Sequence, residues 1–259
     1  MQTERSMSFG SIADQYNRLR PSPPPAAIDW LLPDRATFVV DLAAGTGLLS
    51  RAIGGKAGQV LAVEPDTRMS EVLLEETPGV RAVAGVGEAL PLNEASVDAV
   101  LVSSAWHWMN PEVAVPEIGR VLRDGGRFGL IWTSRDREVA WVRHIDRLRE
   151  PVDSPVLHAP AHQPGGVETP RFRNRYVTLP ESNSFTNIET ASFTFTKTIA
   201  VEDYAPMIAT YSRIITASEQ ERAKILARVR EAIDEQFPGA TEIELPMRSL
   251  CWRADRITR

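Results

Sequence analysis

Short apolar runs alternate with helix-length amphipathic segments along most of the chain. Glycine, proline or acidic residues bound these runs, and the pattern predicts buried strands at 38–42, 59–63, 80–84, 97–102 and 127–132. Apolar residues at three- and four-residue spacing predict helices that begin near Leu48, Asp66 or Thr67, Asn110 and Asp136. Repeated strand–helix units predict an α/β fold with a mainly parallel sheet and helices on both faces.

The periodicity stops between residues 150 and 184, where prolines and glycines are frequent. A loop of this length in a compact protein is typical of a lid. A strand resumes at 188–195, and Ser218 with Glu221 forms a capping-box signature before the next predicted helix. The last apolar run, 243–255, predicts a closing strand that is antiparallel and pairs with the strand near residue 190.

Composition and charge exclude several classes of function. The chain has 259 residues, one cysteine (Cys251), and 29 Lys plus Arg against 34 Asp plus Glu, for a net charge of -5. One cysteine excludes an internal disulfide and a cysteine-based metal cluster, and fits a reducing compartment. The negative balance argues against nucleic acid as the main partner, and we interpret the arginine-bearing stretches 135–149 and 171–175 as solvated faces or loops.

Neither a membrane nor a metal is predicted. The first residues are polar and charged, and the chain lacks the roughly 18 uninterrupted apolar residues that a bilayer span requires. We therefore expect a cytoplasmic protein that contacts no membrane. His144, His158 and His162 have no partners at metal-ligand spacing. The sequence makes no prediction of oligomeric state.

The most informative segment is 41–47, DLAAGTG, which ends the first predicted strand and opens the first helix. Glycines here let a ligand approach the backbone at the carboxyl edge of the sheet, where open α/β folds bind nucleotides. A dinucleotide fingerprint has a third glycine, but Ser50 stands at that position. Glu64 follows the second strand about twenty residues past the glycines, a spacing that nucleotide-binding folds share.

Together these segments resemble class I S-adenosylmethionine-dependent methyltransferases with a type 11 methyltransferase domain. Asp41, Gly45 and Gly47 match the family's first motif, with Ala43 in place of its first glycine, and the resemblance extends over about residues 36–135. It implies a Rossmann-like fold, a seven-stranded sheet with the last strand antiparallel, an N-terminal helical cover and a lid insertion. It also implies S-adenosylmethionine as cofactor, with the ribose hydroxyls on Glu64.

The resemblance also divides the chain and assigns the other donor contacts. A single methyltransferase domain, 1–259, would comprise the N-terminal cover (1–33), the cofactor-binding core (34–149), the lid with the sixth strand (150–218) and the C-terminal helix with the closing strand (219–259). The family's adenine-contacting turn is similar to residues 85–92, GVGEALPL. Further predicted cofactor contacts are Pro65, Met69, Gly87, Glu88, Ala89, Ser103 and Tyr16.

A second set of residues is predicted to hold the methyl acceptor. The segment 103–109, SSAWHWM, resembles an aromatic-His-Trp segment in a subgroup that includes trans-aconitate methyltransferase-like proteins. His107 is the candidate base, since its pKa permits proton transfer near neutral pH. The predicted substrate contacts are Trp106, Trp108, Arg20, Trp132, Arg135 and Tyr211. The structural alternatives are a packed, hydrogen-bonded residue for His107, a helix cap for Arg20, a core aromatic for Trp132 and a surface ion pair for Arg135.

The resemblance implies a methyltransferase that acts on a small molecule, and kinship with the trans-aconitate methyltransferase-like subgroup favours O-methylation of a carboxylate or hydroxyl. A carboxylate would be held by Arg20, and a hydroxyl would be deprotonated by His107. One alternative is C- or N-methylation of a quinone-like or natural-product substrate. The others are a non-catalytic protein that binds S-adenosylmethionine and a nicotinamide-dependent dehydrogenase.

Overall fold

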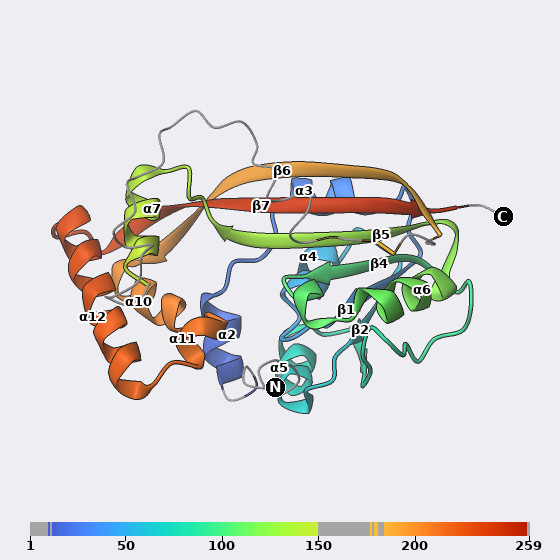
Figure 1. The fold of residues 1–259 in the computed structure, drawn as a ribbon, viewed down its shortest axis with the longest axis horizontal. Coiled ribbons are helices and arrows are strands. Elements are labelled where there is room, and N and C mark those ends of the chain that lie inside the picture. Colours follow the sequence, from blue (N-terminus) through green and yellow to red (C-terminus); the bar gives the residue numbers. More distant parts are fainter. Residues whose placement is uncertain (1–9, 11, 150–176, 178, 181–183, 258–259) are drawn as a thin grey trace. The chain divides into compact units, whose positions relative to one another are not determined.

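A computed structural model describes residues 10, 12–149, 177, 179–180 and 184–257 (Figure 1). Seven strands form one sheet in the order β3-β2-β1-β4-β5-β7-β6. Their bounds are β1 Phe38–Leu42, β2 Gln59–Val63, β3 Arg81–Val83, β4 Val97–Ser103, β5 Leu122–Arg135, β6 Phe185–Ala200 and β7 Glu242–Arg256. The α/β fold with a mainly parallel sheet, one antiparallel strand and β7 beside β6 confirms the prediction.

Helices lie before and between the strands. Their bounds are α2 Ala13–Leu19, α3 Pro25–Leu31, α4 Leu48–Ile53, α5 Thr67–Glu76, α6 Pro111–Val121, α7 Ala140–Arg147, α10 Val201–Ala209, α11 Ser212–Ile215 and α12 Glu219–Gln236, with a short 3-10 helix, η2, at Trp106–Trp108. The predicted caps are confirmed at α5, α6 and α12, where Asp66, Asn110 and Ser218 accept hydrogen bonds from the first-turn amides.

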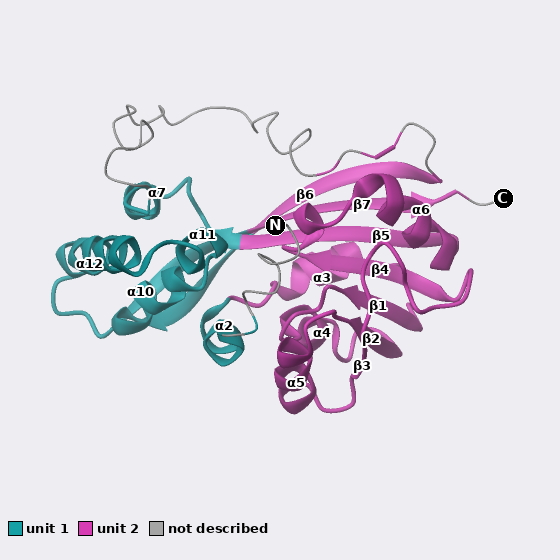
Figure 2. Ribbon diagram, turned by 60° about the horizontal axis from the view of Figure 1, so that its bottom comes forward, with its two compact units in different colours: residues 1–20, 134–169, 194–248 teal, residues 21–133, 170–193, 249–259 magenta. Residues whose placement is uncertain are grey.

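The chain divides into two compact units, coloured separately in Figure 2. Unit 1 comprises residues 1–20, 134–169 and 194–248, and unit 2 comprises 21–133, 170–193 and 249–259. The division falls within the long strands β5, β6 and β7. Most of the predicted lid, 150–184, lies outside the described residues, and the division into cover, core, lid and closing segment stays a prediction. None of the described helices is long and apolar enough to cross a membrane.

The central strands of unit 2, β1 and β4, are buried on both faces. Successive residues of β1 point to opposite sides, so Val39 packs with Ile28 and Leu49 while Val40 packs with Ile118 and Phe128. Such burial on both faces is typical of parallel sheets and explains why these strands are nearly continuous apolar runs. The carboxyl ends of the strands are thereby held in fixed positions.

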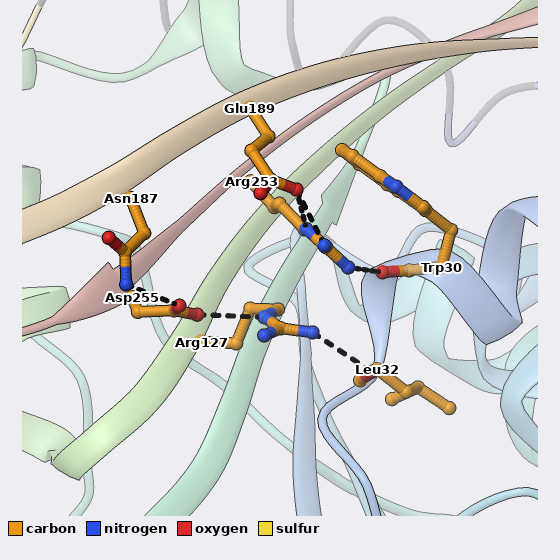
Figure 3. Close-up of polar contacts among 7 residues, drawn as sticks. All are labelled: Trp30, Leu32, Arg127, Asn187, Glu189, Arg253 and Asp255. Carbon is orange, nitrogen blue, oxygen red and sulfur yellow. Dashed lines mark hydrogen bonds and ion pairs between the residues drawn. The ribbon is translucent and has the colours of Figure 1, made fainter.

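Two arginines connect the end of α3 to β5 and β7 within unit 2 (Figure 3). Arg127 donates to the carboxylate of Asp255 at 2.9 Å and to the carbonyl oxygen of Leu32 at 3.1 Å. Arg253 donates to the carbonyl oxygen of Trp30, near the C-terminal end of α3. The last carbonyls of a helix have no intrahelical partner, so these side chains cap the helix from the sheet.

The structure corrects one predicted helix start and adds two helices. The helix predicted from Asp136 begins at Ala140. The amide of Asp136 donates to Pro246 and its carboxylate accepts from Arg248 at 2.9 Å, so β7 holds this residue outside the helix. Helices α10 and α11 were not predicted. With α7 and α12 they enclose the apolar core of unit 1, where Tyr204, Ile208 and Val229 are fully buried.

Candidate functional site

The order of the strands places a ligand-binding position beside β1. This strand pairs in parallel with β2 on one side and with β4 on the other, and Asp41 lies opposite Ala62 and Leu101. Strands β2 and β3 are added on one side of β1, and β4 and β5 on the other, so the strand order reverses between β1 and β4. Open α/β sheets bind ligands outside the carboxyl ends of the strands at such a switch point. The predicted residues of 41–47 and 103–108 follow these two strands directly.

The turn after β1 contains three residues in the left-handed backbone region. The φ angles are +55° at Ala43, +57° at Gly45 and +82° at Gly47. Glycine adopts this region freely, whereas Ala43 bears a cost of about 1–2 kcal/mol. A Cβ atom at Gly47 would lie 2.8 Å from Cγ of Leu73, so α5 leaves no space for a side chain there. Alanine at the family's first glycine position thus retains the glycine-like conformation.

Glu64 joins this turn to the end of β2. Its Oε2 accepts from the amide of Gly45 at 2.8 Å, and its Oε1 accepts from the amide of Asp66 at 2.9 Å. The residue is 8% exposed, and burial raises the pKa of Glu64 although the two amides act in the opposite direction. Each carboxylate oxygen has two acceptor positions, so Glu64 retains capacity for two further donors. These backbone contacts were not predicted.

Met69 contacts the same turn, and Pro65 is the neighbour of Glu64 in the chain. Cε of Met69 would be 3.3 Å from a Cβ atom at Gly45, so this buried side chain contacts the glycine turn directly. Pro65, between Glu64 and the α5 cap, is exposed. Both are predicted cofactor contacts, and their contact with a ligand stays a prediction.

Asp41 is completely buried beside Ser50. The hydroxyl of Ser50 donates to Oδ2 of Asp41 at 2.7 Å, and Oδ1 has no hydrogen-bond partner among the described residues. Burial raises the pKa of Asp41 to about 7. Ser50 occupies the position where a dinucleotide fingerprint has its third glycine, and here its hydroxyl donates a hydrogen bond to Asp41. The structure therefore gives a reason for serine at this position.

The raised pKa of Asp41 predicts how stability varies with pH. Below about pH 4 the carboxyl is protonated in both folded and unfolded chains, whereas between pH 4 and 7 the unfolded chain ionises first. We therefore expect the free energy of unfolding to fall over this window in the wild type, relative to Asp41→Asn. Chemical denaturation at pH 4, 5.5 and 7 measures this difference. Parallel profiles for the two proteins would contradict the assignment.

The predicted adenine turn is a tight one. The amide of Ala89 donates to the carbonyl oxygen of Val86 at 3.1 Å, which closes a turn around Gly87 and Glu88. A Cβ atom at Gly87 would lie 2.7 Å from the sulfur of Met109. Oε1 of Glu88 accepts from the amide of Asn110 at 2.7 Å and so connects this turn to the start of α6.

Beyond β4 the chain bends sharply into η2. Ser104 follows Ser103 with a φ of +57°, a strained angle for a residue other than glycine. Trp106 is 3% exposed and packs edge-on against Phe128 in the core. The ring of His107 lies 4.5 Å from that of Trp108.

Partial burial lowers the pKa of His107, so the imidazole is largely neutral at pH 7 and competent to accept a proton. Trp132, on β5, packs partly buried against the same core. Of the predicted aromatic contacts after β4, Trp108 is the one beside the candidate base.

Unit 1 brings together the other four predicted residues. The guanidinium carbon of Arg20 lies 3.7 Å from the ring centre of Tyr211 and 5.0 Å from that of Tyr16. The guanidinium carbon of Arg135 lies 4.7 Å from the ring centre of Tyr211. These residues come from α2, the end of β5 and the residue before α11. Sequence reasoning missed a fifth member, Arg149, at 4.6 Å from the same ring centre.

The interpretation of 135–149 as a solvated face is wrong at its two ends. The side chain of Arg135 is 3% exposed and that of Arg149 is 12% exposed, and both pair with Asp146. Asp146 and Arg149 are three residues apart, a spacing that indicates an ion pair but does not show its burial. The rings of Tyr204, on α10, and Tyr211, the residue before α11, lie against these arginines, and neither helix was predicted. The other basic stretch, 171–175, lies outside the described residues.

No group of three or more histidine, cysteine or acidic side chains among the described residues is arranged to hold a metal ion. The expectation of no metal stays a prediction. The polar groups of the switch point are instead backbone amides and the carboxylates of Asp41 and Glu64.

The comparisons with known proteins agree with this geometry. The methyltransferase domain family matches residues 40–130. An uncharacterized methyltransferase of Mycobacterium tuberculosis (strain H37Rv) is 40% identical over 253 residues, which cover 97% of this chain and 96% of the relative. An uncharacterized methyltransferase-like protein of Schizosaccharomyces pombe is 30% identical over 231 residues, 86% of this chain and 85% of that protein.

The same fold occurs in a solved structure. A putative type II methyltransferase from Anaeromyxobacter dehalogenans is similar with a TM-score of 0.67 at 22% identity, over 93% of this chain and 99% of that one. Fold, glycine turn and relatives of nearly full length agree, and the chain belongs to the class I S-adenosylmethionine-dependent methyltransferase family.

Proposed function

We propose that unit 2 binds S-adenosylmethionine at the carboxyl ends of β1, β2 and β4 and that the enzyme methylates a small molecule. The observation that carries this proposal is the contact between Glu64 and the amide of Gly45, which fixes an acceptor carboxylate beside a glycine turn at the switch point. The residues present fit the donor. Gly45 and Gly47 give the turn its left-handed backbone and its close packing against α5. Glu64 has acceptor capacity for both ribose hydroxyls.

Other residues of unit 2 would complete the donor site. The turn at Gly87–Ala89 offers backbone groups to the adenine ring, and Met69 contacts the base of the glycine turn. Asp41 is the penultimate residue of β1 and Ser103 is the last residue of β4, the two strands that flank the switch point. The donor, when bound, supplies a methyl group already activated by its sulfonium. The protein then has to position the acceptor and exclude water.

For the acceptor atom we propose oxygen, as in the trans-aconitate methyltransferase-like subgroup that residues 103–109 resemble. His107 and Trp108 follow β4 at the same edge of the sheet as the glycine turn. A neutral imidazole at pH 7 is suited to take the proton of an acceptor hydroxyl as the methyl group is transferred. A carboxylate acceptor is already ionised and requires no base.

Isothermal titration tests donor binding. We expect the full-length protein to bind S-adenosylhomocysteine, the demethylated product, at one site and to give no comparable heat with NAD. Binding of NAD in place of S-adenosylhomocysteine would contradict the proposed donor site.

The role of His107 is tested by its replacement. With a hydroxyl acceptor, His107→Gln is expected to lower kcat at pH 7 by about 100-fold or more, because proton transfer by a positioned side chain typically contributes that much. Affinity for S-adenosylhomocysteine is expected to remain unchanged. Unchanged kcat, or an equal loss of kcat and donor affinity, would argue against a base at this position.

A further inference from the structure

Three guanidinium groups surround the ring of Tyr211 in unit 1, and we call Arg20, Arg135, Arg149 and Tyr211 the Tyr211 cluster. Their guanidinium carbons lie 3.7, 4.7 and 4.6 Å from the ring centre, in that order. Contacts between a cation and an aromatic face are common singly. Three cations on one ring repel each other, so the arrangement requires negative charge nearby.

The described residues supply less negative charge than the cluster requires. Asp146 pairs with Arg135 at 2.6 Å and with Arg149, and it also accepts from the more exposed Arg137. Arg20 donates to a carbonyl oxygen, that of Thr210 at 3.0 Å. Three guanidinium groups against one carboxylate leave two positive charges unbalanced.

The excess of positive charge lowers the pKa of Tyr211. Burial alone would raise the pKa of Tyr211, but the charges of Arg135, Arg20 and Arg149 outweigh it and hold that pKa below its ordinary value. Lys197 adds to the positive field, since its ammonium group donates to the carbonyl oxygens of Leu19 and Arg20.

Several hydrogen-bonding groups of the cluster are also buried and unpartnered among the described residues. They are Nε of Arg20, Nε and Nη1 of Arg135, Nε of Arg149 and the hydroxyl group of Tyr211. The hydroxyl group of Tyr204, whose ring lies beside Arg135, is also buried and unpartnered among the described residues. Buried polar groups are almost always hydrogen-bonded, and a buried charge without a partner is costly. An oxyanion would supply both the acceptors and the charge that this cluster lacks.

We propose that unit 1 binds a small molecule through an oxyanion of about two negative charges, a dicarboxylate or a phosphate group, at the Tyr211 cluster. Guanidinium groups bind both kinds of oxyanion through paired hydrogen bonds. Arg20 and Arg149 are partly exposed whereas Arg135 is buried, so the first two are the members that an entering anion reaches. The proposal concerns unit 1 alone and does not depend on donor binding. Only the step from this ligand to the methyl acceptor rests on the proposed function.

Titration of the full-length protein with malonate, inorganic phosphate and chloride tests the proposal. We expect malonate or phosphate to bind at one site, and chloride, which lacks oxyanion geometry, to bind far more weakly. Arg20→Gln and Arg149→Gln should each weaken binding about 10- to 100-fold, the typical effect of losing a hydrogen bond to a charged group. Arg230→Gln, at an exposed position of α12, is the matched control and should bind as the wild type does.

Tighter binding of malonate would indicate a carboxylate ligand, and tighter binding of phosphate would indicate a phosphate group. Absence of binding by both probes, equal binding of chloride, or unchanged affinity in Arg20→Gln would overturn the proposal. Circular dichroism of each variant shows whether it is folded. Titration with S-adenosylhomocysteine is independent of this result, so failure of the donor site and failure of the anion site are distinguishable.

A second measurement needs no variant that alters the arginines. A bound anion offsets the field of the guanidinium groups, so the pKa of Tyr211 should rise when malonate or phosphate binds. Ultraviolet absorbance follows the ionisation of tyrosine, and Tyr211→Phe identifies the contribution of this residue. Identical titration of Tyr211 with and without the bound probe would also overturn the proposal.

Discussion

Replacement of Asp146 by asparagine is expected to lower the free energy of unfolding by about 3–5 kcal/mol, the typical cost of removing one partner from a buried ion pair. Asp146 is paired with Arg135, whose side chain is 3% exposed, and with Arg149. Asparagine keeps the size of the side chain but leaves both guanidinium groups without their counter-charge. The expected loss of stability therefore comes from the unpaired buried charges more than from a change in packing.

Asp203→Asn is the matched control for this experiment. Asp203 also pairs with an arginine in unit 1, but its partner Arg18 is 61% exposed, and solvent screens the pair. Pairs of this kind contribute about 0–1 kcal/mol. Urea denaturation of both variants measures the contrast, and an equal loss in the two would show that burial of Asp146 has no special energetic role.

Replacement of Glu64 by glutamine is expected to weaken binding of S-adenosylhomocysteine by about 100-fold or more. Each charge-assisted hydrogen bond to a ribose hydroxyl contributes about 1.5–3 kcal/mol, and the carboxylate is proposed to accept two. The substitution also places an amide donor against the amide of Gly45 or of Asp66, which loosens the glycine turn. A cost of about 1–3 kcal/mol in stability is expected from that mismatch.

Affinity for the donor product should also fall at low pH. Burial raises the pKa of Glu64, so the carboxylate that accepts the ribose hydroxyls is lost at a higher pH than for an ordinary glutamate. Glu75→Gln, at an exposed position of α5, is the control and should bind as the wild type does at every pH. Wild-type affinity in a folded Glu64→Gln protein would exclude the proposed ribose contact.

Local signals were sufficient to predict the order of elements in unit 2. Apolar runs such as Val39–Val40, the cap at Asp66 and the proline at the start of α6 specify strands and helix ends through contacts within a few residues. The glycines at 45 and 47 specify the turn for the same reason, because their backbone angles are left-handed. These features need no knowledge of distant contacts.

Contacts between residues far apart in the sequence determined the positions and the burial of several polar residues. Asp136 has the chemistry of a helix cap, yet Arg248, 112 residues further along the chain, holds it outside α7. Arg135 and Arg149 have the appearance of solvated residues in the sequence, but in the structure their side chains are 3% and 12% exposed and both pair with Asp146. A sequence pattern shows the polarity of a residue and not the elements that will cover it.

The sequence by itself determined the class of fold, the position of the glycine turn and the candidate residues Glu64, His107, Arg20 and Tyr211. The fold class and the glycine turn follow from periodicity and from a motif of adjacent residues. His107 and Arg20 are predicted from the resemblance of their segments to a known family, and Tyr211 from its place in the predicted lid. Only the tertiary structure decided that Glu64 ties the turn to β2, that Trp106 belongs to the core, and that Arg20, Arg135 and Arg149 share one tyrosine ring. The physical reason is that hydrogen bonds and charge interactions act over a few ångströms, and only folding brings residues 20, 135, 149 and 211 within that range.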